Sequence, residues 1–223
     1  IAARSAGEGG IVVRVRRREV EAGEDDVRIV GPDREAARVG QGPSRLDVDG
    51  LPRVAEVGAD QWALDTPCTE WNVRTLVNHV TVEDLWVPPL LRGATIEEIG
   101  DQFDGDQLGD DPMAAWRKAH DQAVRAVGGL TSVESTVHLS FGDFPASFYL
   151  TQLIFDHVVH AWDLATAIGA DTRLDPELVD FSADEFVIQE DSYRASGAIA
   201  ERPSIPAEAD AQTRLLAMFG RAA

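Results

Sequence analysis

The chain has little of several features on which whole functional classes depend. Its 223 residues include one cysteine, which excludes an internal disulfide framework and suits a reducing cytoplasm. Lys and Arg number 20 against 39 Asp and Glu, and a formal charge of -19 argues against nucleic-acid or anionic-membrane partners. No apolar run approaches the roughly 20 residues that cross a bilayer. The sequence therefore predicts a cytoplasmic protein with neither nucleic acid nor membrane as a partner.

Several catalytic signatures are also missing. The sequence has no Gly-rich phosphate loop, no strand-to-helix nucleophile elbow and no Cys-x-x-Cys motif. Its opening stretch places a short apolar run before an Arg cluster, which is the wrong order for a signal peptide. These absences leave metal-dependent chemistry and simple binding as the classes to test.

Composition divides the chain into two parts. Residues 1–45 are rich in Gly, Arg, Glu and Asp and almost free of aromatic side chains, so we expect a poorly packed or disordered tail. A weak hairpin turning at Gly23 is the alternative for this segment. Residues 46–223 have the size and apolar content of one domain with its own core.

Hydrophobic periodicity in that domain is helical. The spacing predicts about four main helices, an all-α fold, and one short extended segment that turns at Gly142. Asn72 is the expected N-cap of the first clear helix, which we expect Pro88 and Pro89 to end or kink. The other predicted helices cover residues 112–127, 145–168, 175–191 and 209–221.

One polar stripe stands out in the longest predicted helix, within "FDHVVHAWDLA" at residues 155–165. Asp156 and His160 are four residues apart and share a face, and Gln152 and Asp163 extend the same stripe. Polar groups in an apolar face are costly unless they are satisfied. A metal ion would satisfy them, and so would an ordinary hydrogen bond between Asp156 and His160.

His79 supplies the matching group from another helix, on the apolar side of "LVNHV". Taken alone it is a satisfied core histidine, but with Asp156 and His160 it forms a recurrent bundle metal-site pattern. Three ligands leave one coordination position open, as in catalytic rather than structural sites. Asp163, one turn beyond His160, is either the acceptor for a ligand imidazole N–H or a surface acid.

Four other side chains are weaker candidates for a functional role. His157 is a half-exposed neighbour in this interpretation, although it could replace Asp156 as the partner of His160. His120 lies among charged residues and is expected to be solvated, and His138 has no partner nearby in sequence. Cys68 precedes a helix, which would favour a reactive thiolate, but a packed and inert cysteine is the simpler expectation.

Three stretches together carry a family resemblance: "DQWALDTPCTEWNVRTLVNHV", "HAWDLATAIG" and "QTRLLAMFGR". The chain resembles actinobacterial metal-binding proteins related to the N-terminal domain of mycothiol-dependent maleylpyruvate isomerase, within the DinB-like (YfiT-like) bundles. The resemblance implies a four-helix bundle with additional C-terminal helices. It also implies one divalent ion, most often zinc, held at the positions of His79, Asp156 and His160.

The same resemblance implies a function. A metal-activated external thiol, mycothiol, would attack an electrophilic small-molecule substrate, as in a thiol S-transferase or a maleylpyruvate isomerase-like enzyme. A metal-dependent hydrolase and a non-catalytic metal-binding scaffold are the rival interpretations.

Two departures from the family pattern matter. Asp156 stands where the isomerase has Glu, and Gly50 and Pro52 interrupt the expected first helix. A truncated first helix would leave the bundle incompletely closed, or closed by a second copy in a homodimer.

Overall fold

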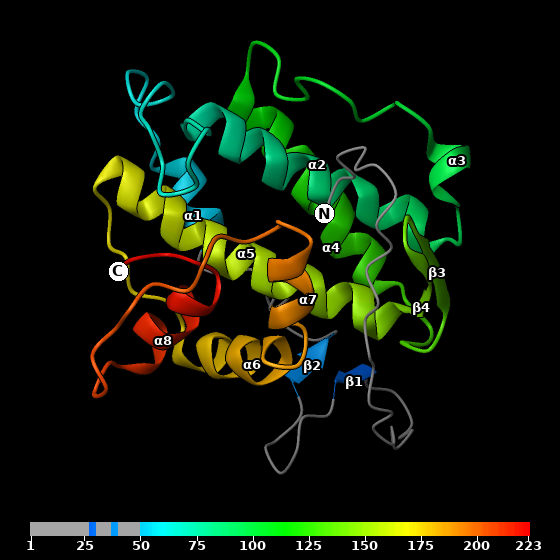
Figure 1. Cartoon of the computed structure of the whole chain (residues 1–223). Coiled ribbons are helices and arrows are strands. Elements are labelled where there is room, and N and C mark those ends of the chain that lie inside the picture. Colours follow the sequence, from blue (N-terminus) through cyan, green and yellow to red (C-terminus); the bar gives the residue numbers. More distant parts are fainter. Residues whose placement is uncertain (1–26, 30–36, 40–49) are drawn as a thin grey trace.

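The computed structural model describes residues 27–29, 37–39 and 50–223, with side chains described from Arg53 onward. Figure 1 shows the long helices side by side, with shorter elements at the ends. The helices are α1 (Gly50–Ala55), α2 (Val73–Leu91), α3 (Ile96–Ile99), α4 (Pro112–Gly128), α5 (Ala146–Ile168), α6 (Pro176–Phe186), α7 (Glu190–Ala195) and α8 (Ala211–Met218). The strands are β1 (Val27–Ile29), β2 (Ala37–Val39), β3 (Thr136–Leu139) and β4 (Gly142–Pro145).

The helix ends follow the local sequence signals closely. Asn72 Oδ1 accepts a hydrogen bond from the Thr75 backbone N–H at 2.9 Å and so caps α2 as predicted. Asp111 caps α4 in the same way, with Pro112 in the first turn. Gly169 ends α5 in a left-handed conformation, φ 71°, which costs glycine little.

Of the two effects expected of Pro88 and Pro89, the end of the helix does not occur at these residues. Residues Pro88 and Pro89 do not end α2, which continues through both of them to Leu91. A proline lacks the N–H that would bond to the preceding turn, and its ring crowds that turn, but the residues after it can stay helical. Only two residues of α2 follow Pro89. The prolines therefore lie in the last turn of α2.

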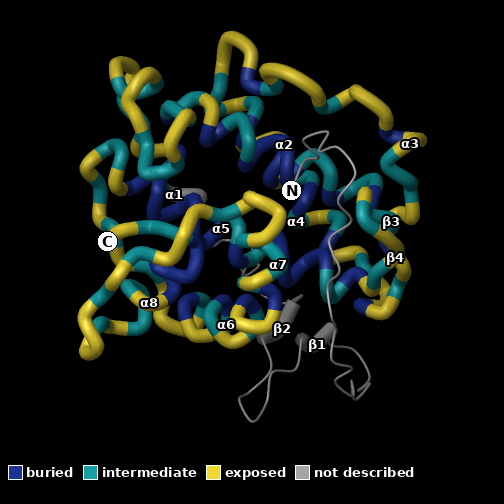
Figure 2. The backbone as a smooth tube through the Cα atoms, in the orientation of Figure 1, coloured by how far each residue is buried: buried dark blue, intermediate teal, exposed yellow. Residues whose placement is uncertain are grey.

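Packing around α5 confirms the all-α bundle predicted from the sequence. Helix α2 packs against α4 and α5, and α5 also contacts α1 and α6, while α8 covers α6. The buried residues of α2 and α5 lie in the middle of the molecule in Figure 2, whereas the loops around them are exposed. Three apolar clusters fill the interior, and each includes a residue of α5: Leu150, Phe155 or Leu164. This helix is therefore the structural axis of the domain.

Two small antiparallel hairpins complete the described chain. Strands β3 and β4 pair around residues 140–141, which confirms the extended segment and its turn near Gly142. Strand β1 pairs with β2, which follows it in the sequence, so this hairpin does not turn at the predicted Gly23. Gly23 and most of the predicted tail lie outside the described residues. Within the described part, no helix combines the length and apolarity that a membrane crossing requires.

Candidate metal centre

Helices α2 and α5 bring three of the sequence-predicted residues together. His79 of α2 and Asp156 and His160 of α5 each offer one ligand atom, and these atoms lie within 4.8 Å of one another. His79 Nε2 is 3.3 Å from Asp156 Oδ2, and His160 Nε2 is 3.6 Å from Asp156 Oδ1. The Nε2 atoms of both histidines therefore face the carboxylate of Asp156.

The two distances from the imidazole nitrogens to Asp156 are close to those between ligands of a single ion. Ligands held about 2.0–2.1 Å from a tetrahedral zinc ion lie about 3.3 Å apart. The two N···O distances are close to that value and are too long for strong hydrogen bonds. Asp156 Oδ2 is fully buried and has no hydrogen-bond partner among the described residues. A cation would satisfy this buried oxygen, in a carboxylate that faces an imidazole nitrogen with each of its two oxygens.

Electrostatics keep Asp156 in the form that a metal requires. Burial alone would raise the pKa of this carboxyl, but the facing imidazoles of His160 and His79 hold the pKa well below its ordinary value. A carboxylate that stays ionised across the physiological range is an oxygen ligand without prior loss of a proton.

Asp163 fixes the orientation of His160. The Nδ1–H of His160 donates to Asp163 Oδ2 at 2.9 Å. Because that nitrogen carries the proton in the neutral ring, the lone pair is on Nε2, which faces Asp156. Asp163 is completely buried and accepts from the His160 imidazole, so the alternative of a surface acid is wrong.

Arg221, close to the last residue of the chain, holds Asp163 in turn. Its Nε donates to Asp163 Oδ1 at 3.0 Å and its NH2 donates to Oδ2 at 2.7 Å, a bidentate pair. Burial would raise the pKa of Asp163, but hydrogen bonds from His160 and Arg221 lower it. The three residues form a continuous line from the C-terminal segment to the His79–Asp156–His160 cluster.

The turn at the end of α8 directs Arg221 into this line. Gly220 N–H donates to Ala217 O at 3.0 Å and Arg221 N–H donates to Leu216 O at 2.9 Å, the Schellman pattern of a helix end. Gly220 has φ 78°, and a Cβ there would lie 2.8 Å from the backbone oxygen and the Cβ of Ala200. Only glycine fits this position without a shift of the chain.

The turn formed by "TPCTEW", residues 66–71, lies beside the His79–Asp156–His160 cluster. Thr66 Oγ1 donates within this turn to the carbonyl oxygens of Cys68 at 3.1 Å and Trp71 at 3.0 Å. This turn sets the Trp71 ring 4.8 Å from the His79 ring and 5.6 Å from the His160 ring, measured between centroids. The indole therefore covers both imidazoles on one side and restricts water there.

Comparison with known proteins identifies the family of this arrangement. The family model for the mycothiol maleylpyruvate isomerase N-terminal domain matches residues 45–165, more than half of the chain. The chain belongs to that family. An uncharacterized protein from Mycobacterium tuberculosis strain CDC 1551 / Oshkosh is 33% identical over 170 residues, covering 75% of this chain and 89% of the relative. One from strain ATCC 25618 / H37Rv matches with the same identity and coverage. No solved structure matches significantly.

The family match includes His79, Asp156, His160 and Asp163 but ends before Arg221. The bidentate pair therefore joins a residue of the mycothiol maleylpyruvate isomerase N-terminal domain to the segment that follows it. The family model matches 121 residues, from 45 to 165. The relatives with 33% identity match this chain over 170 residues, which is a longer range.

His157 faces away from the cluster, and the expectation of a half-exposed side chain is wrong. Its side chain is buried, with Nδ1 donating to Leu153 O at 2.9 Å and Nε2 lying 3.3 Å from Asp84 Oδ1. Burial lowers the pKa of this imidazole, but Asp84 outweighs it and raises the pKa to about 9. An imidazole that uses both nitrogens as donors has no lone pair to offer a metal ion.

His120 is also buried, and the prediction that it is solvated is wrong. Its Nδ1 is 3.5 Å from Asp84 Oδ2, and its ring stacks on Trp116 with centroids 5.9 Å apart. Asp84 thus lies between His120 and His157, and although burial raises its pKa, the two imidazoles lower it overall. This buried trio stabilises the contact of α2 with α4 and α5 on the side away from the metal cluster.

The remaining two candidates are more peripheral. His138, for which no partner was expected, lies with Nδ1 2.7 Å from Asp143 Oδ1 across the β3–β4 hairpin. Cys68 is half-buried, and burial raises the pKa of its thiol despite the lowering effect of Arg221. A thiol with a raised pKa is a weak nucleophile at neutral pH, in line with the packed cysteine that the sequence favoured.

Glu83 and Arg221 are functional candidates that the sequence analysis missed. Glu83 is 3% exposed and its Oε1 lies 4.0 Å from His79 Nδ1, one turn further along α2. The four-residue spacing from His79 is a signal that could have found it. Arg221 has no such signal, because 58 residues separate it from Asp163.

Proposed function

We propose that the protein binds one divalent metal ion, most often zinc, through His79, Asp156 and His160, and uses it to activate mycothiol as a nucleophile. The observation that carries the proposal is the convergence of the two Nε2 atoms and one carboxylate between α2 and α5. Family membership supports the thiol, because mycothiol is part of the name of the matched family.

The donor set suits this chemistry. Two imidazoles and one carboxylate leave a zinc ion one coordination position short, and when bound such an ion favours the thiolate form of a thiol. The protein would supply orientation: Asp163 and Arg221 hold His160, and Trp71 restricts water on one side of the cluster. The thiolate would form a C–S bond with an electrophilic carbon of a small molecule, and a proton from water would then complete a thiol adduct. Bond rotation and expulsion of the thiolate would instead release an isomer.

The charge of the site is compatible with a thiolate. The carboxylate of Asp156 offsets one of the two charges of a divalent ion, which leaves a net positive centre for the sulfur anion. A cytoplasmic location would provide reduced thiol, as the single cysteine of the chain suggests.

Cobalt substitution tests the proposal directly. Cobalt bound in place of zinc gives an intense charge-transfer band when sulfur coordinates it. We expect this band when mycothiol or N-acetylcysteine is added to the cobalt-loaded protein, and no band with N-acetylserine, which lacks only the sulfur. The thiol should bind more weakly as pH falls, because protons compete for the sulfur.

The rival functions give other outcomes. An unchanged spectrum at saturating thiol, together with metal-dependent ester hydrolysis, would favour a hydrolase. An unchanged spectrum without hydrolysis, in a protein whose unfolding temperature falls on metal removal, would favour a scaffold in which the ion joins α2 to α5.

A further inference from the structure

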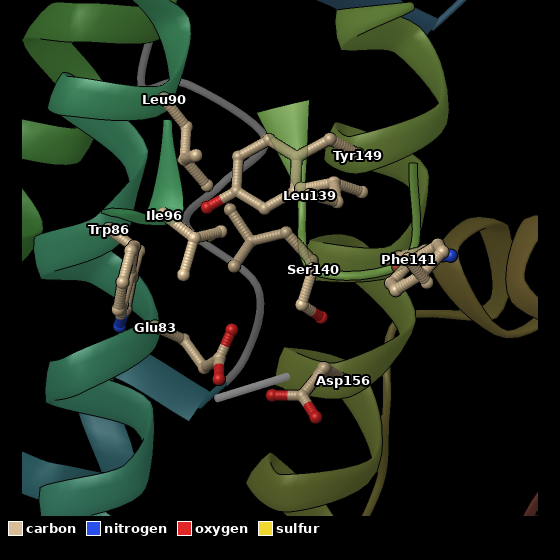
Figure 3. Close-up of a pocket in the computed structure, with 11 residues that line it drawn as sticks. Glu83, Trp86, Leu90, Ile96, Leu139, Ser140, Phe141, Tyr149 and Asp156 are labelled. Carbon is tan, nitrogen blue, oxygen red and sulfur yellow. The ribbon is translucent and has the colours of Figure 1, made fainter. Parts of the chain in front are cut away.

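A pocket between α2 and α5 opens beside the metal cluster. Asp156 and Glu83 lie at one end, and Tyr149 and Leu90 lie toward the other (Figure 3). Asp156 and Tyr149 are seven residues apart on α5, about 10 Å along the helix at 1.5 Å per residue. The pocket encloses about 60 Å³, so a ligand with one ring and a short side chain would enter it with only part of its length.

The walls of this pocket are mainly apolar. Side chains from α2, α3, the β3–β4 hairpin and α5 line it, and most of them are large hydrocarbons or aromatic rings. The apolar lining consists of Trp86, Leu90, Ile96, Leu139, Phe141 and Leu153. Burial of an apolar group here would contribute about 25 cal/mol for each Å² removed from water.

Charge in the pocket has one sign. The two ionisable carboxyl groups are Glu83 and Asp156, and no Lys, Arg or His occurs among the described residues that line it. Glu83 and Asp156 lie at the same end of the pocket, so two carboxyl groups face a ligand there (Figure 3). In the metal-free protein, an anionic ligand would lose its hydration in this pocket without a basic side chain to receive it, which is costly.

Three neutral polar side chains line the pocket, Ser140, Gln152 and Tyr149, and the hydroxyl of Tyr149 is the one that is both buried and without a hydrogen-bond partner among the described residues. Burial raises the pKa of this phenol well above its ordinary value, and the carboxylates of Glu83, Asp84 and Asp156 raise it further. The group is therefore a hydrogen-bond donor that a ligand carbonyl oxygen could satisfy.

We propose that this pocket binds the electrophilic substrate, and that the substrate is an uncharged, largely apolar carbonyl compound of about one ring in size. This inference rests on the proposed function for the identity of the ligand as a substrate. Maleylpyruvate does not fit this description, because its two carboxylates would face Glu83 without any basic side chain in the pocket wall. The Tyr149 hydroxyl donates to the carbonyl oxygen, and the apolar walls enclose the rest.

An isosteric pair of probes tests the charge. Cinnamamide and cinnamate share the ring and the double bond and differ in an amide against a carboxylate. We expect cinnamamide to bind at least about ten-fold more tightly by calorimetry, which corresponds to about 1.4 kcal/mol. The comparison is made in zinc-loaded and in EDTA-treated full-length protein, because a carboxylate can also bind zinc directly. Equal or tighter binding of cinnamate to the metal-free protein would overturn the inference, as would no detectable binding of cinnamamide.

A matched pair of tyrosine variants tests the location. Tyr149→Phe removes only the hydroxyl in the pocket, and we expect it to weaken cinnamamide binding about five-fold or more. Tyr193→Phe is the control, because Tyr193 packs on Phe155 and Phe186 outside the pocket and should not alter binding. Equal effects of the two variants would contradict the assignment of the pocket.

The outcomes separate this inference from the proposed function. A protein that binds no zinc but prefers cinnamamide through Tyr149 would refute the metal proposal and retain the pocket. A protein that shows the cobalt–thiol band but binds cinnamate at least as well as cinnamamide when metal-free would retain the metal and refute the pocket.

Discussion

Arg221 and Asp163 form a bidentate ion pair, at 3.0 and 2.7 Å, that joins the C-terminal segment to α5 across 58 residues of sequence. Asp163 is completely buried and accepts a hydrogen bond from His160 on its other side. A side chain of the C-terminal segment thereby helps to orient a proposed metal ligand.

Loss of Arg221 should weaken metal binding. Arg221→Met leaves Asp163 with one of its two partners, so His160 loses part of its orientation, and we expect the zinc affinity to fall about ten-fold or more. Competition with a chelating dye measures this affinity. Arg214→Met is the control, because Arg214 is exposed on α8 and has no contact with Asp163. An unchanged affinity in Arg221→Met would show that Asp163 positions His160 without help.

Among the described glycines, Gly220 should be the most sensitive to a methyl group. Gly220→Ala adds a Cβ 2.8 Å from Ala200 and requires φ 78°, so we expect a loss of roughly 2 kcal/mol or more in the free energy of unfolding. Gly197→Ala has a similar φ of 75° but open space around the new Cβ, so it should cost only about 1 kcal/mol. Urea denaturation of the two variants separates the steric cost from the backbone cost, and equal losses would contradict the close approach.

The His157–Asp84 pair predicts a pH dependence of stability. The pKa of His157 is raised from 6.5 to about 9 in the folded protein. A raised pKa means that the folded state holds the proton more tightly, so the stabilisation is complete below pH 6.5 and is lost as pH rises through 9. We expect metal-free protein to lose up to about 3 kcal/mol over this window.

Asp84→Asn supplies the comparison for that measurement. The variant should be less stable at pH 6 by about 3 kcal/mol, because it leaves His157 buried without its carboxylate. Its stability should also change little between pH 6.5 and 9. Parallel pH profiles for the two proteins, measured by urea denaturation, would show that the pair does not hold a proton.

Cys68 should be chemically quiet. Burial raises the pKa of its thiol, so alkylation by iodoacetamide should be slow at pH 7 and should accelerate at higher pH. Cys68→Ser should retain the metal content and any thiol-transfer activity within a few-fold. Because the chain has one cysteine, mass spectrometry reports this residue alone. Rapid labelling at pH 7, or loss of activity in a folded and metal-loaded Cys68→Ser, would make it a nucleophile.

The features predictable from the sequence are those within a single helix. The faces of Asp156, His160 and Asp163 follow from the 3.6-residue period, and the caps at Asn72 and Asp111 follow from short-range hydrogen bonds. Local physics determines these features, and no knowledge of the tertiary packing was required.

Features that depend on packing between distant segments were missed or misjudged. His120 has charged neighbours in sequence, yet it lies four residues after Trp116 and three before Ala123, both on the buried face of α4. That spacing could have indicated its burial. The direction of His157 depends on Asp84 in another helix, and the role of Arg221 depends on the fold of the C-terminal segment. No periodicity in the sequence reports such pairs.

Zinc content per chain tests the central claim most directly. We expect about one zinc ion per chain in the wild-type protein by mass spectrometry of the metal, and close to none in His79→Ala, Asp156→Ala or His160→Ala. His138→Ala is the matched control, since this partly exposed histidine of the hairpin lies apart from the cluster and should leave the zinc content unchanged. Full zinc content in folded His79→Ala and His160→Ala would contradict the account.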